Sequence, residues 1–447
     1  MKMRNKKICF IYPSYYDDNG NIVKRKRSWI PSRTLPYLAA LTPKQYEVEI
    51  VDERVDELKF SQNNDLIALT GMTNHIPRAI DIAKKYKNYG KKVIIGGPGA
   101  FSLQNKLEVM DCFDSIVIGE AEAVWDDVLD DFIKGDLKRI YKGKHLQELK
   151  GFPFARYDLL NAKNYRKAIT DPNMFIVPIE TSRGCPHDCE FCLVNKIFGR
   201  HVRYRPISEV VDEIQYQKGN YVLFTDDNIA VNPDRAKELF QALKPLEINW
   251  FGQFDTTVIN NPDVIKLAGE SGCRSAFIGI ESLNQNNLVS VNKKHNLSVQ
   301  VEELFQQFKR AKINVMCSII FGLVHDTPES LWDTVHFLIK NNIEMMVPWI
   351  LTPLPKTQIY EDYQNKGLML HDNYSLYDFT HCVYKHEQMK PDELEQIFWQ
   401  VYQHFYNLKA IIPRCLNRGS LKESVRLFIR ELYFRYGVNH HRHPFLS

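Results

Sequence analysis

Three cysteines stand close together in the stretch RGCPHDCEFC, which spans residues 183–192. Cys185, Cys189 and Cys192 are spaced C-x3-C-x2-C, and the aromatic Phe191 precedes the last of them. Thiolates at such short spacing bind zinc or an iron–sulfur cluster. Three ligands are one short of a closed four-coordinate site, so either a fourth ligand comes from elsewhere or the fourth position is open.

The residues alone leave three kinds of site possible. His187 lies within the loop and His201 follows it, and either could complete a structural zinc site. A redox-active C-x2-C pair is a second alternative, although three cysteines that occur as a set after a predicted strand fit it less well. The third is an iron–sulfur cluster with an open position.

The bulk composition excludes several classes of protein. The chain has 447 residues, 44% hydrophobic and 25% charged, which predicts two or three ordinary globular domains. Its net charge of +4 is too small to indicate nucleic-acid binding. No apolar run approaches the roughly 20 residues that cross a bilayer, and the N-terminus predicts a strand, not a signal peptide. Few cysteines, most of them scattered singly, indicate a reducing cytoplasm.

Residues 1–135 alternate predicted strands and helices, which indicates a doubly wound, Rossmann-like α/β domain. Such sheets bind ligands beyond the C-terminal ends of their strands. Those ends carry Pro13, Gly71, Thr73, Asn74, Gly96, Gly97, Pro98, Gly119 and Glu120. Tight turns without a ligand are the alternative explanation for these residues.

A second alternating region begins after a connecting segment at 136–175, which has no sustained hydrophobic period. From 176 to 385, six predicted strands with intervening helices indicate a partial TIM-type (β/α)6 barrel, whose chemistry is expected at the C-terminal strand ends. Those ends carry Asp226, Asp227, Glu281, Ser282 and Gly322.

Residues 386–447 predict a helical C-terminal extension. Its last helix has an apolar stripe made of Leu421, Val425, Phe428, Ile429, Leu432 and Tyr436. We expect this helix to pack on the barrel, and contact with a membrane surface is the alternative.

The longer stretch ETSRGCPHDCEFCLV resembles the cluster loop of the radical S-adenosylmethionine (SAM) superfamily. Later segments resemble successive barrel strands of its cobalamin-binding branch: YVLFTDDNIAVNPDRAKELF, FIGIESLNQNNL, IIFGLVHDTPESLWDT and ILTPLPKTQIY. DLIALTGMTNHIPRAIDIA, KKVIIGGPGAF and SIVIGEAEAVW resemble the N-terminal domain of that branch, and the C-terminal extension is similar to that of its hopanoid-methylase-like subgroup.

The resemblance implies a [4Fe–4S] cluster held by Cys185, Cys189 and Cys192, with one iron left free for the amino and carboxylate groups of SAM. By the same analogy, SAM would be contacted by Phe191, Asp226, Asp227, Glu281, Ser282 and Gly322. The alternative for each acidic residue is a helix N-cap or a salt bridge.

The resemblance also implies that cobalamin lies against the strand-end residues of the N-terminal domain named above. The motif D-x-H-x2-G of other cobalamin carriers does not occur in the sequence, so no histidine ligand to cobalt is expected. The alternative is a domain that has kept the fold and lost the cofactor.

The family implies an enzyme that methylates an unactivated carbon through a 5′-deoxyadenosyl radical and methylcobalamin. The alternatives are an oxidoreductase or cyclase without methyl transfer, a tRNA methylthiotransferase-like enzyme and a non-catalytic cofactor sensor. Expected partners are a small-molecule or lipid-like substrate and an electron donor such as flavodoxin or ferredoxin, with no nucleic acid and no transmembrane segment.

Overall fold

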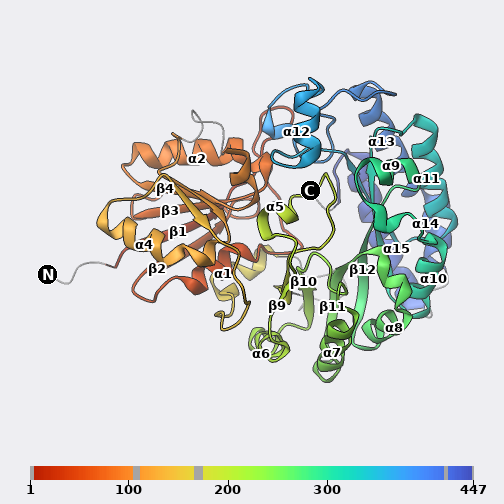
Figure 1. Ribbon diagram of the computed structural model, residues 1–447, viewed down its shortest axis with the longest axis horizontal. Coiled ribbons are helices and arrows are strands. Elements are labelled where there is room, and N and C mark those ends of the chain that lie inside the picture. Colours follow the sequence, from red (N-terminus) through yellow and green to blue (C-terminus); the bar gives the residue numbers. More distant parts are fainter. Residues whose placement is uncertain (1–4, 104–110, 166–174, 417–420, 445–447) are drawn as a thin grey trace.

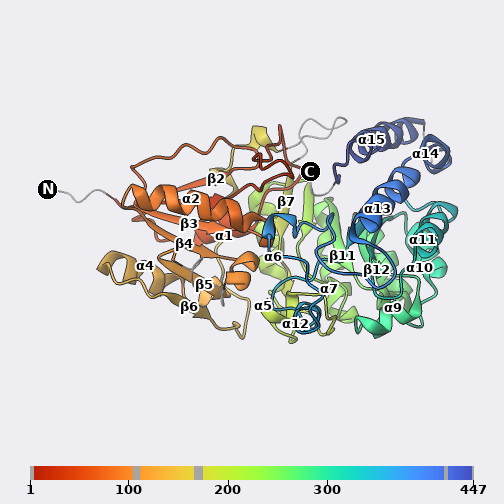
Figure 2. The ribbon, with the colours of Figure 1, turned by 90° about the horizontal axis from the view of Figure 1, so that it is seen from above.

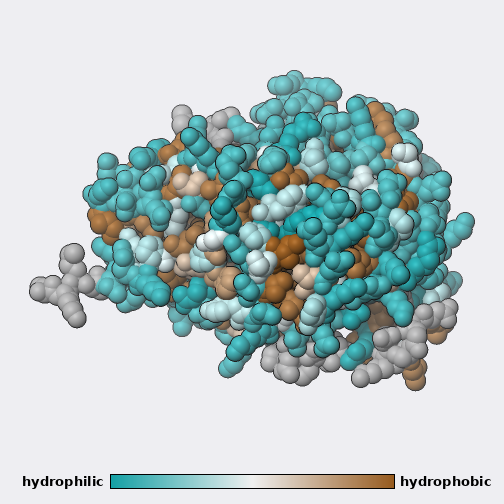
Figure 3. All heavy atoms as spheres, turned by 60° about the horizontal axis from the view of Figure 1, so that its bottom comes forward, coloured by the Kyte–Doolittle hydropathy of each residue, from teal (hydrophilic) through white to brown (hydrophobic). Residues whose placement is uncertain are grey.

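The structure is a computed structural model that describes residues 5–103, 111–165, 175–416 and 421–444. Two sheets of parallel strands lie next to one another, and helices cover both of them (Figure 1). On the face shown in Figure 3, most of the surface is hydrophilic, and hydrophobic atoms are grouped in a few patches.

The first sheet confirms the predicted Rossmann-like domain. In spatial order its parallel strands are β2 (Glu47–Asp52), β1 (Lys7–Tyr12), β3 (Leu66–Thr70), β4 (Lys92–Gly96), β5 (Ser115–Gly119) and β6 (Ile140–Gly143). Helix α2 (Ile76–Asn88) covers one face, and α1 (Thr34–Leu41) and α4 (Trp125–Lys134) cover the other (Figure 1). Because both faces are covered, a central strand such as β3 is buried along its whole length.

Strand β6 lies inside the segment that we expected to be a linker. It pairs in parallel with β5, so the first sheet extends to Gly143 and past residue 135. Its four residues, IYKG, are too few and too mixed in polarity to show a strand period. Residues 166–174 of the expected linker lie outside the described part of the chain.

The second sheet confirms the predicted six-stranded partial barrel. Its strands, in spatial order, are β14 (Met345–Ile350), β13 (Asn314–Phe321), β12 (Cys273–Glu281), β11 (Asn249–Phe254), β10 (Tyr221–Phe224) and β7 (Ile176–Ile179). A short antiparallel pair, β8 (Ser182–Arg183) with β9 (Arg203–Tyr204), follows β7. All pairings in the six-stranded sheet are parallel, so the C-terminal strand ends meet at one edge.

Helices follow the barrel strands. They are α5 (Val194–Phe198), α6 (Ile207–Gln217), α7 (Pro233–Leu243), α8 (Pro262–Glu270), α9 (Gln285–Ser290), α10 (Val301–Arg310), α11 (Pro328–Lys340) and α12 (Gln358–Asn365). Helices α6, α7, α8, α10 and α11 cover the outside of the sheet, whereas α5 lies at the contact with the first sheet (Figure 1). Several begin with proline, which fixes a helical φ where no N–H is needed, as Pro328 does after the Thr327 cap of α11.

The C-terminal extension is helical, as predicted, but its last helix packs differently from our expectation. Helices α13 (Pro391–Phe405), α14 (Leu408–Cys415) and α15 (Leu421–Asn439) lie together at the end of the molecule away from the first sheet (Figure 2). The face of α15 that is buried contains Glu431, Phe434 and Val438. The predicted apolar stripe lies on the opposite side and is largely exposed.

An apolar cluster and a buried group of charges join the two sheets. Leu193 and Leu354 of the barrel pack into the core under α2. The Arg183 side chain contacts Glu180 (2.9 Å) on its own side of the boundary and Glu120 (3.0 Å) and Glu122 (2.7 Å) on the other side. Although burial opposes ionisation, Arg33 and Arg183 lower the pKa of Glu180 to about 2.

Replacing Arg183 with leucine should lower the free energy of unfolding by about 3–5 kcal/mol, because it leaves three carboxylates without their common partner. Urea unfolding followed by tryptophan fluorescence measures the loss. The matched control is Arg156→Leu, which removes an exposed pair with Asp158 and should change stability by less than about 1 kcal/mol. Equal small losses in both variants would contradict a stabilising role for the Arg183 contacts.

Candidate active site

The cysteine loop begins where β8 ends and closes at α5. Gly184 makes the first turn with a φ of 98°, and a Cβ there would lie 2.7 Å from the carbonyl oxygen of His201. The amide of Cys192 donates to the carbonyl of Cys189 (3.1 Å), which folds the loop back on itself. The three cysteines are therefore brought together, half-buried, at the C-terminal edge of the barrel.

The electrostatics of the three thiols fit a cluster or metal ion. Burial raises the pKa of Cys189 to about 11 and that of Cys192 to about 12, and the sulfurs raise one another's pKa further. Thiolates at neutral pH therefore need positive charge beside them, which bound iron would supply. Neither histidine proposed for zinc completes the set: Nε2 of His187 contacts Asp255 (2.5 Å), and His201 is exposed.

The two aspartates after β10 have different surroundings. The Asp226 carboxylate is fully buried and accepts hydrogen bonds from the Thr181 amide (3.0 Å), the Thr181 hydroxyl (2.7 Å) and the Ser182 hydroxyl (2.5 Å). Its oxygens thus hold the segment that leads into the cysteine loop. Asp227 accepts a backbone hydrogen bond from Gly184, and burial, together with Asp226, raises its pKa to about 7. Of the two carboxylates, only Asp227 is placed to face a ligand beside the cysteines.

Glu281 ends β12 at a β-bulge and has a left-handed φ of 66°. The bulge turns its side chain between two donors: Lys293 Nζ reaches Oε1 (3.0 Å), and the Ser318 hydroxyl reaches Oε2 (3.1 Å). Trp349 of β14 donates to the same Ser318 hydroxyl (3.1 Å). Gly279 leaves room for the pair, because a Cβ there would lie 2.4 Å from Glu281 Oε1.

Ser282 and Gly322, two further predicted SAM contacts, form hydrogen bonds with other residues of the protein. The Ser282 hydroxyl accepts from the Asn284 amide (3.1 Å). Gly322 has a φ of 86°, and its carbonyl accepts a hydrogen bond from the Tyr384 hydroxyl. Its amide donates to Asp326 (2.9 Å). The conformation of Gly322 is thus required by the turn itself and is not by itself a sign of a ligand.

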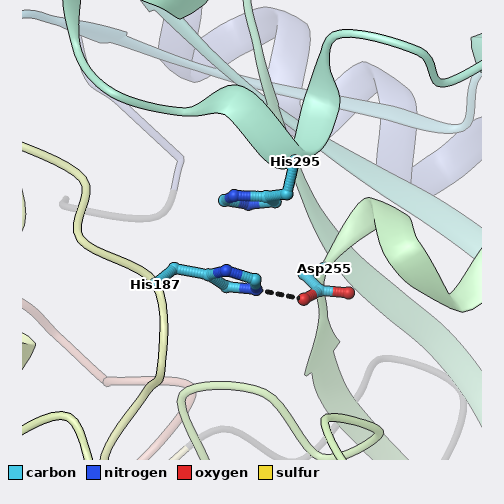
Figure 4. A group of neighbouring side chains, drawn as sticks. All are labelled: His187, Asp255 and His295. Carbon is cyan, nitrogen blue, oxygen red and sulfur yellow. Dashed lines mark hydrogen bonds and ion pairs between the residues drawn. The ribbon is translucent and has the colours of Figure 1, made fainter.

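Further residues that the sequence did not predict lie around the loop. Lys293 lies 5.9 Å from the Phe191 ring centroid and lowers the pKa of Cys189, so it is a cation beside the thiols. His187 stacks on His295 with ring centroids 3.6 Å apart and contacts Asp255 at the end of β11 (Figure 4). Lys293 and His295 come from the segment VNKKH, whose residues have no spacing typical of a ligand-binding motif. In the sequence, only the position of Asp255 at a strand end could have indicated this group of residues.

The predicted cobalamin contacts lie together at the C-terminal edge of the first sheet, but several are engaged with protein. The Gly99 amide donates to the Gly71 carbonyl (2.8 Å), and a Cβ on Gly97 would lie 2.3 Å from the Thr70 hydroxyl. A Cβ on Gly119 would lie 2.2 Å from the Gly143 carbonyl. These glycines are required by backbone packing, whatever binds above them.

Most of the remaining predicted cobalamin contacts at this edge are also buried or engaged with protein. Pro13 is buried at the end of β1, and Thr73 and Asn74 form a buried turn that packs against residues 374–376. Gly96 and Pro98 border the turn after β4. Glu120 is held by Arg183 (3.0 Å) and Arg203 (2.6 Å), so its carboxylate serves the contact between the sheets.

A cavity of about 770 Å³ opens between the loop after β1 and the segment before α13. Asp17, Asp18, His381, Asp392 and Glu395 are among its lining residues. None of the predicted SAM or cobalamin contacts lines it, so it is separate from the strand-end site.

Comparison with known proteins places these features in a family. Residues 179–338 match the family model of the radical SAM superfamily. Bacteriochlorophyllide d C-12(1)-methyltransferase of Chlorobaculum tepidum is 30% identical over 391 residues, which is 84% of this chain and 83% of that protein. Bacteriochlorophyllide d C-8(2)-methyltransferase of the same organism is 28% identical over 396 residues, 86% of this chain and 87% of that protein.

Among solved structures, the radical SAM methyltransferase TsrM of Kitasatospora setae, with cobalamin and a [4Fe–4S] cluster bound, superposes with a TM-score of 0.67. The alignment covers 96% of this chain and 99% of TsrM at 13% identity, so it establishes a common fold.

The variants Asp226→Asn and Asp227→Asn form a matched pair. The first tests whether Asp226 supports the cysteine loop, and the second tests whether Asp227 is dispensable for that support. Asp226→Asn should lower stability by about 3 kcal/mol, since an amide cannot accept all three hydrogen bonds, and should reduce the iron bound after anaerobic reconstitution to less than about half. Asp227→Asn should retain the iron. Colorimetric iron assay and thermal unfolding measure both effects; full iron loading of Asp226→Asn would contradict the assignment.

Proposed function

Because this chain belongs to the radical SAM superfamily, we propose that it is a cobalamin-dependent methyltransferase that methylates an unactivated carbon of a small, weakly polar molecule. The observation that carries the proposal is the meeting of three thiols with Asp227 and the Glu281–Lys293 pair at one edge of a parallel barrel. Two relatives of similar length are methyltransferases whose names specify carbon positions of bacteriochlorophyllide d.

In this proposal Cys185, Cys189 and Cys192 hold a [4Fe–4S] cluster and leave one iron for SAM. When bound, the cluster and SAM supply a 5′-deoxyadenosyl radical, and cobalamin supplies the methyl group. Lys293 balances the negative charge of the thiolates, and Glu281 orients Lys293 through its hydrogen bond. Asp227 and Phe191 are the remaining groups placed to contact SAM.

Cobalamin would lie against the C-terminal edge of the first sheet, where Thr73, Asn74 and the turn 96–98 come together. This edge lies beside the barrel, because Leu193 and Leu354 of the barrel pack into the same core. We further propose that reduced flavodoxin or ferredoxin supplies the electron. None of the nine cysteines, all of which lie in the described part of the chain, forms a disulfide, which is compatible with work in the reducing cytoplasm.

The first test of the proposal is the fate of labelled SAM. Reconstituted enzyme, given methyl-labelled SAM, cobalamin, a reductant and an apolar extract of source cells that lack this gene, should transfer label to one extracted compound. It should release S-adenosylhomocysteine and 5′-deoxyadenosine in equal amounts, because one SAM donates the methyl group and a second is cleaved. Liquid chromatography with mass spectrometry measures all three. 5′-Deoxyadenosine without labelled product would instead indicate an oxidoreductase or cyclase.

A second test uses Cys185→Ala, which removes one cluster ligand. It should abolish 5′-deoxyadenosine formation, whereas Cys112→Ala, a half-buried cysteine of the first domain, should leave it within about twofold of the parent. SAM cleavage by reconstituted Cys185→Ala would contradict the cluster assignment.

A further inference from the structure

Helix α15 exposes apolar side chains along its whole length. Leu421, Val425, Ile429, Leu432 and Tyr436 lie on one side, and Leu421 and Tyr436 are 82% and 58% exposed. Leu408, Ile412 and Leu416 are also exposed, on and directly after α14, which packs against α15. We call these eight residues the C-terminal apolar stripe. So many exposed apolar side chains on two adjacent helices are unusual on a surface that faces only water.

The stripe is not the face through which α15 packs on the rest of the protein. With 3.6 residues per turn, Val425, Ile429 and Leu432 project opposite Phe434 and Val438, which are buried. Helix α15 therefore already packs on the protein through a different face. Its side that carries the stripe is available for an outside partner.

Positive charge predominates in the segment that carries the stripe. Residues 408–444 contain eight lysines and arginines and two glutamates, a net charge of +6, which exceeds the +4 of the whole chain. Glu431, the one carboxylate of this segment whose side chain the structure describes, is buried and pairs with Arg414 (3.3 Å) and Arg430 (2.8 Å). The exposed charges described here, those of Lys409, Arg426 and Arg442, are all cationic.

The charges also lie where a membrane-bound helix needs them. By helical spacing, Arg426 and Arg430 lie along one flank of the stripe and Arg435 along the other. Arg426 is exposed, whereas Arg430 also pairs with Glu431 and Arg435 donates to the Tyr406 carbonyl (3.1 Å). Long cationic side chains at the flanks can reach lipid phosphates while the apolar side chains between them enter the acyl region. A symmetric contact between two copies through the same face would place these arginines against one another, which is unfavourable.

The stripe is connected with the active site through the end of the same segment. His443 stacks on Trp349 with ring centroids 4.8 Å apart and hydrogen-bonds the Pro348 carbonyl (2.9 Å). Trp349 in turn donates to Ser318, the partner of Glu281. The segment that carries the stripe thus continues to a buried histidine that contacts β14 next to Ser318.

We propose that α14 and α15 form a docking surface for a membrane that contains anionic lipid. The docking itself does not depend on the proposed methyltransferase function. Given that function, the surface would hold the barrel next to apolar substrates dissolved in the bilayer. In the described chain no helix is long and apolar enough to span a bilayer, so the contact is peripheral.

Vesicle flotation of the reconstituted full-length enzyme tests the docking without any substrate. Binding to vesicles of phosphatidylcholine and phosphatidylglycerol should be at least about tenfold stronger than to phosphatidylcholine alone and should weaken as salt rises. No binding to either vesicle, or equal binding to both, would overturn the proposal.

Ile429→Asp should reduce vesicle binding about tenfold or more, because it places a charge in the centre of the stripe. The matched control is Ile133→Asp on α4, where an isoleucine is similarly exposed (55% against 40% for Ile429) but has no flanking arginines. Both variants should keep the parent's melting temperature and its formation of 5′-deoxyadenosine, so loss of docking is distinguishable from failure of the proposed chemistry.

Two further outcomes would overturn membrane docking. One is unchanged vesicle binding by Ile429→Asp. The other is a dimer of the parent, measured by light scattering, that Ile429→Asp converts to a monomer, since the stripe would then be an interface between two copies.

Discussion

The arrangement of this molecule depends on one buried arginine. Arg183 is the last residue before the turn into the cysteine loop, and its side chain is 4% exposed. It joins Glu180 at the end of β7 to Glu120 and Glu122 at the end of the first sheet. A charge buried to this degree is tolerated only where its partners are fixed, so the two sheets and the start of the loop are held in one mutual orientation.

The carboxylates near Arg183 all follow predicted strands in the sequence, but they have different roles in the structure. Asp226 uses its oxygens to support the loop, and Glu120 uses its own to join the sheets. Asp227 and Glu281 are left next to the thiols, and Glu281 is accompanied by Lys293. The division follows from the local donors. Asp226 is held by an amide and two hydroxyls and Glu120 by two arginines, whereas Asp227 meets a single backbone amide and Glu281 meets Lys293 and the Ser318 hydroxyl.

Much of this could be predicted from the sequence, because buried parallel strands give apolar runs and strand ends give polar residues. Both sheets were predictable in that way, and the spacing of the three cysteines marked the loop that follows β8; the ligand contacts assigned to the strand ends stay predictions. Three features were not. The strand β6 is too short to show a period, and Lys293 and His295 come from a turn with no spacing pattern. The stripe on α15 has the period of a packed helix, and only the tertiary structure shows that Phe434 and Val438 form the packed face. The glycines at strand ends were predicted for a ligand, yet close backbone contacts already explain Gly97 and Gly119.

The backbone of Glu281 has one more consequence. Its left-handed φ of 66° is unfavourable by roughly 1 kcal/mol for a residue with a side chain, and glycine or asparagine would adopt it more readily. Glycine at this position would relieve that strain but would leave the buried Lys293 without its carboxylate partner, which costs about 3–5 kcal/mol. The buried ion pair therefore outweighs the strained backbone, and an attempt to stabilise the protein by relaxing position 281 is expected to destabilise it.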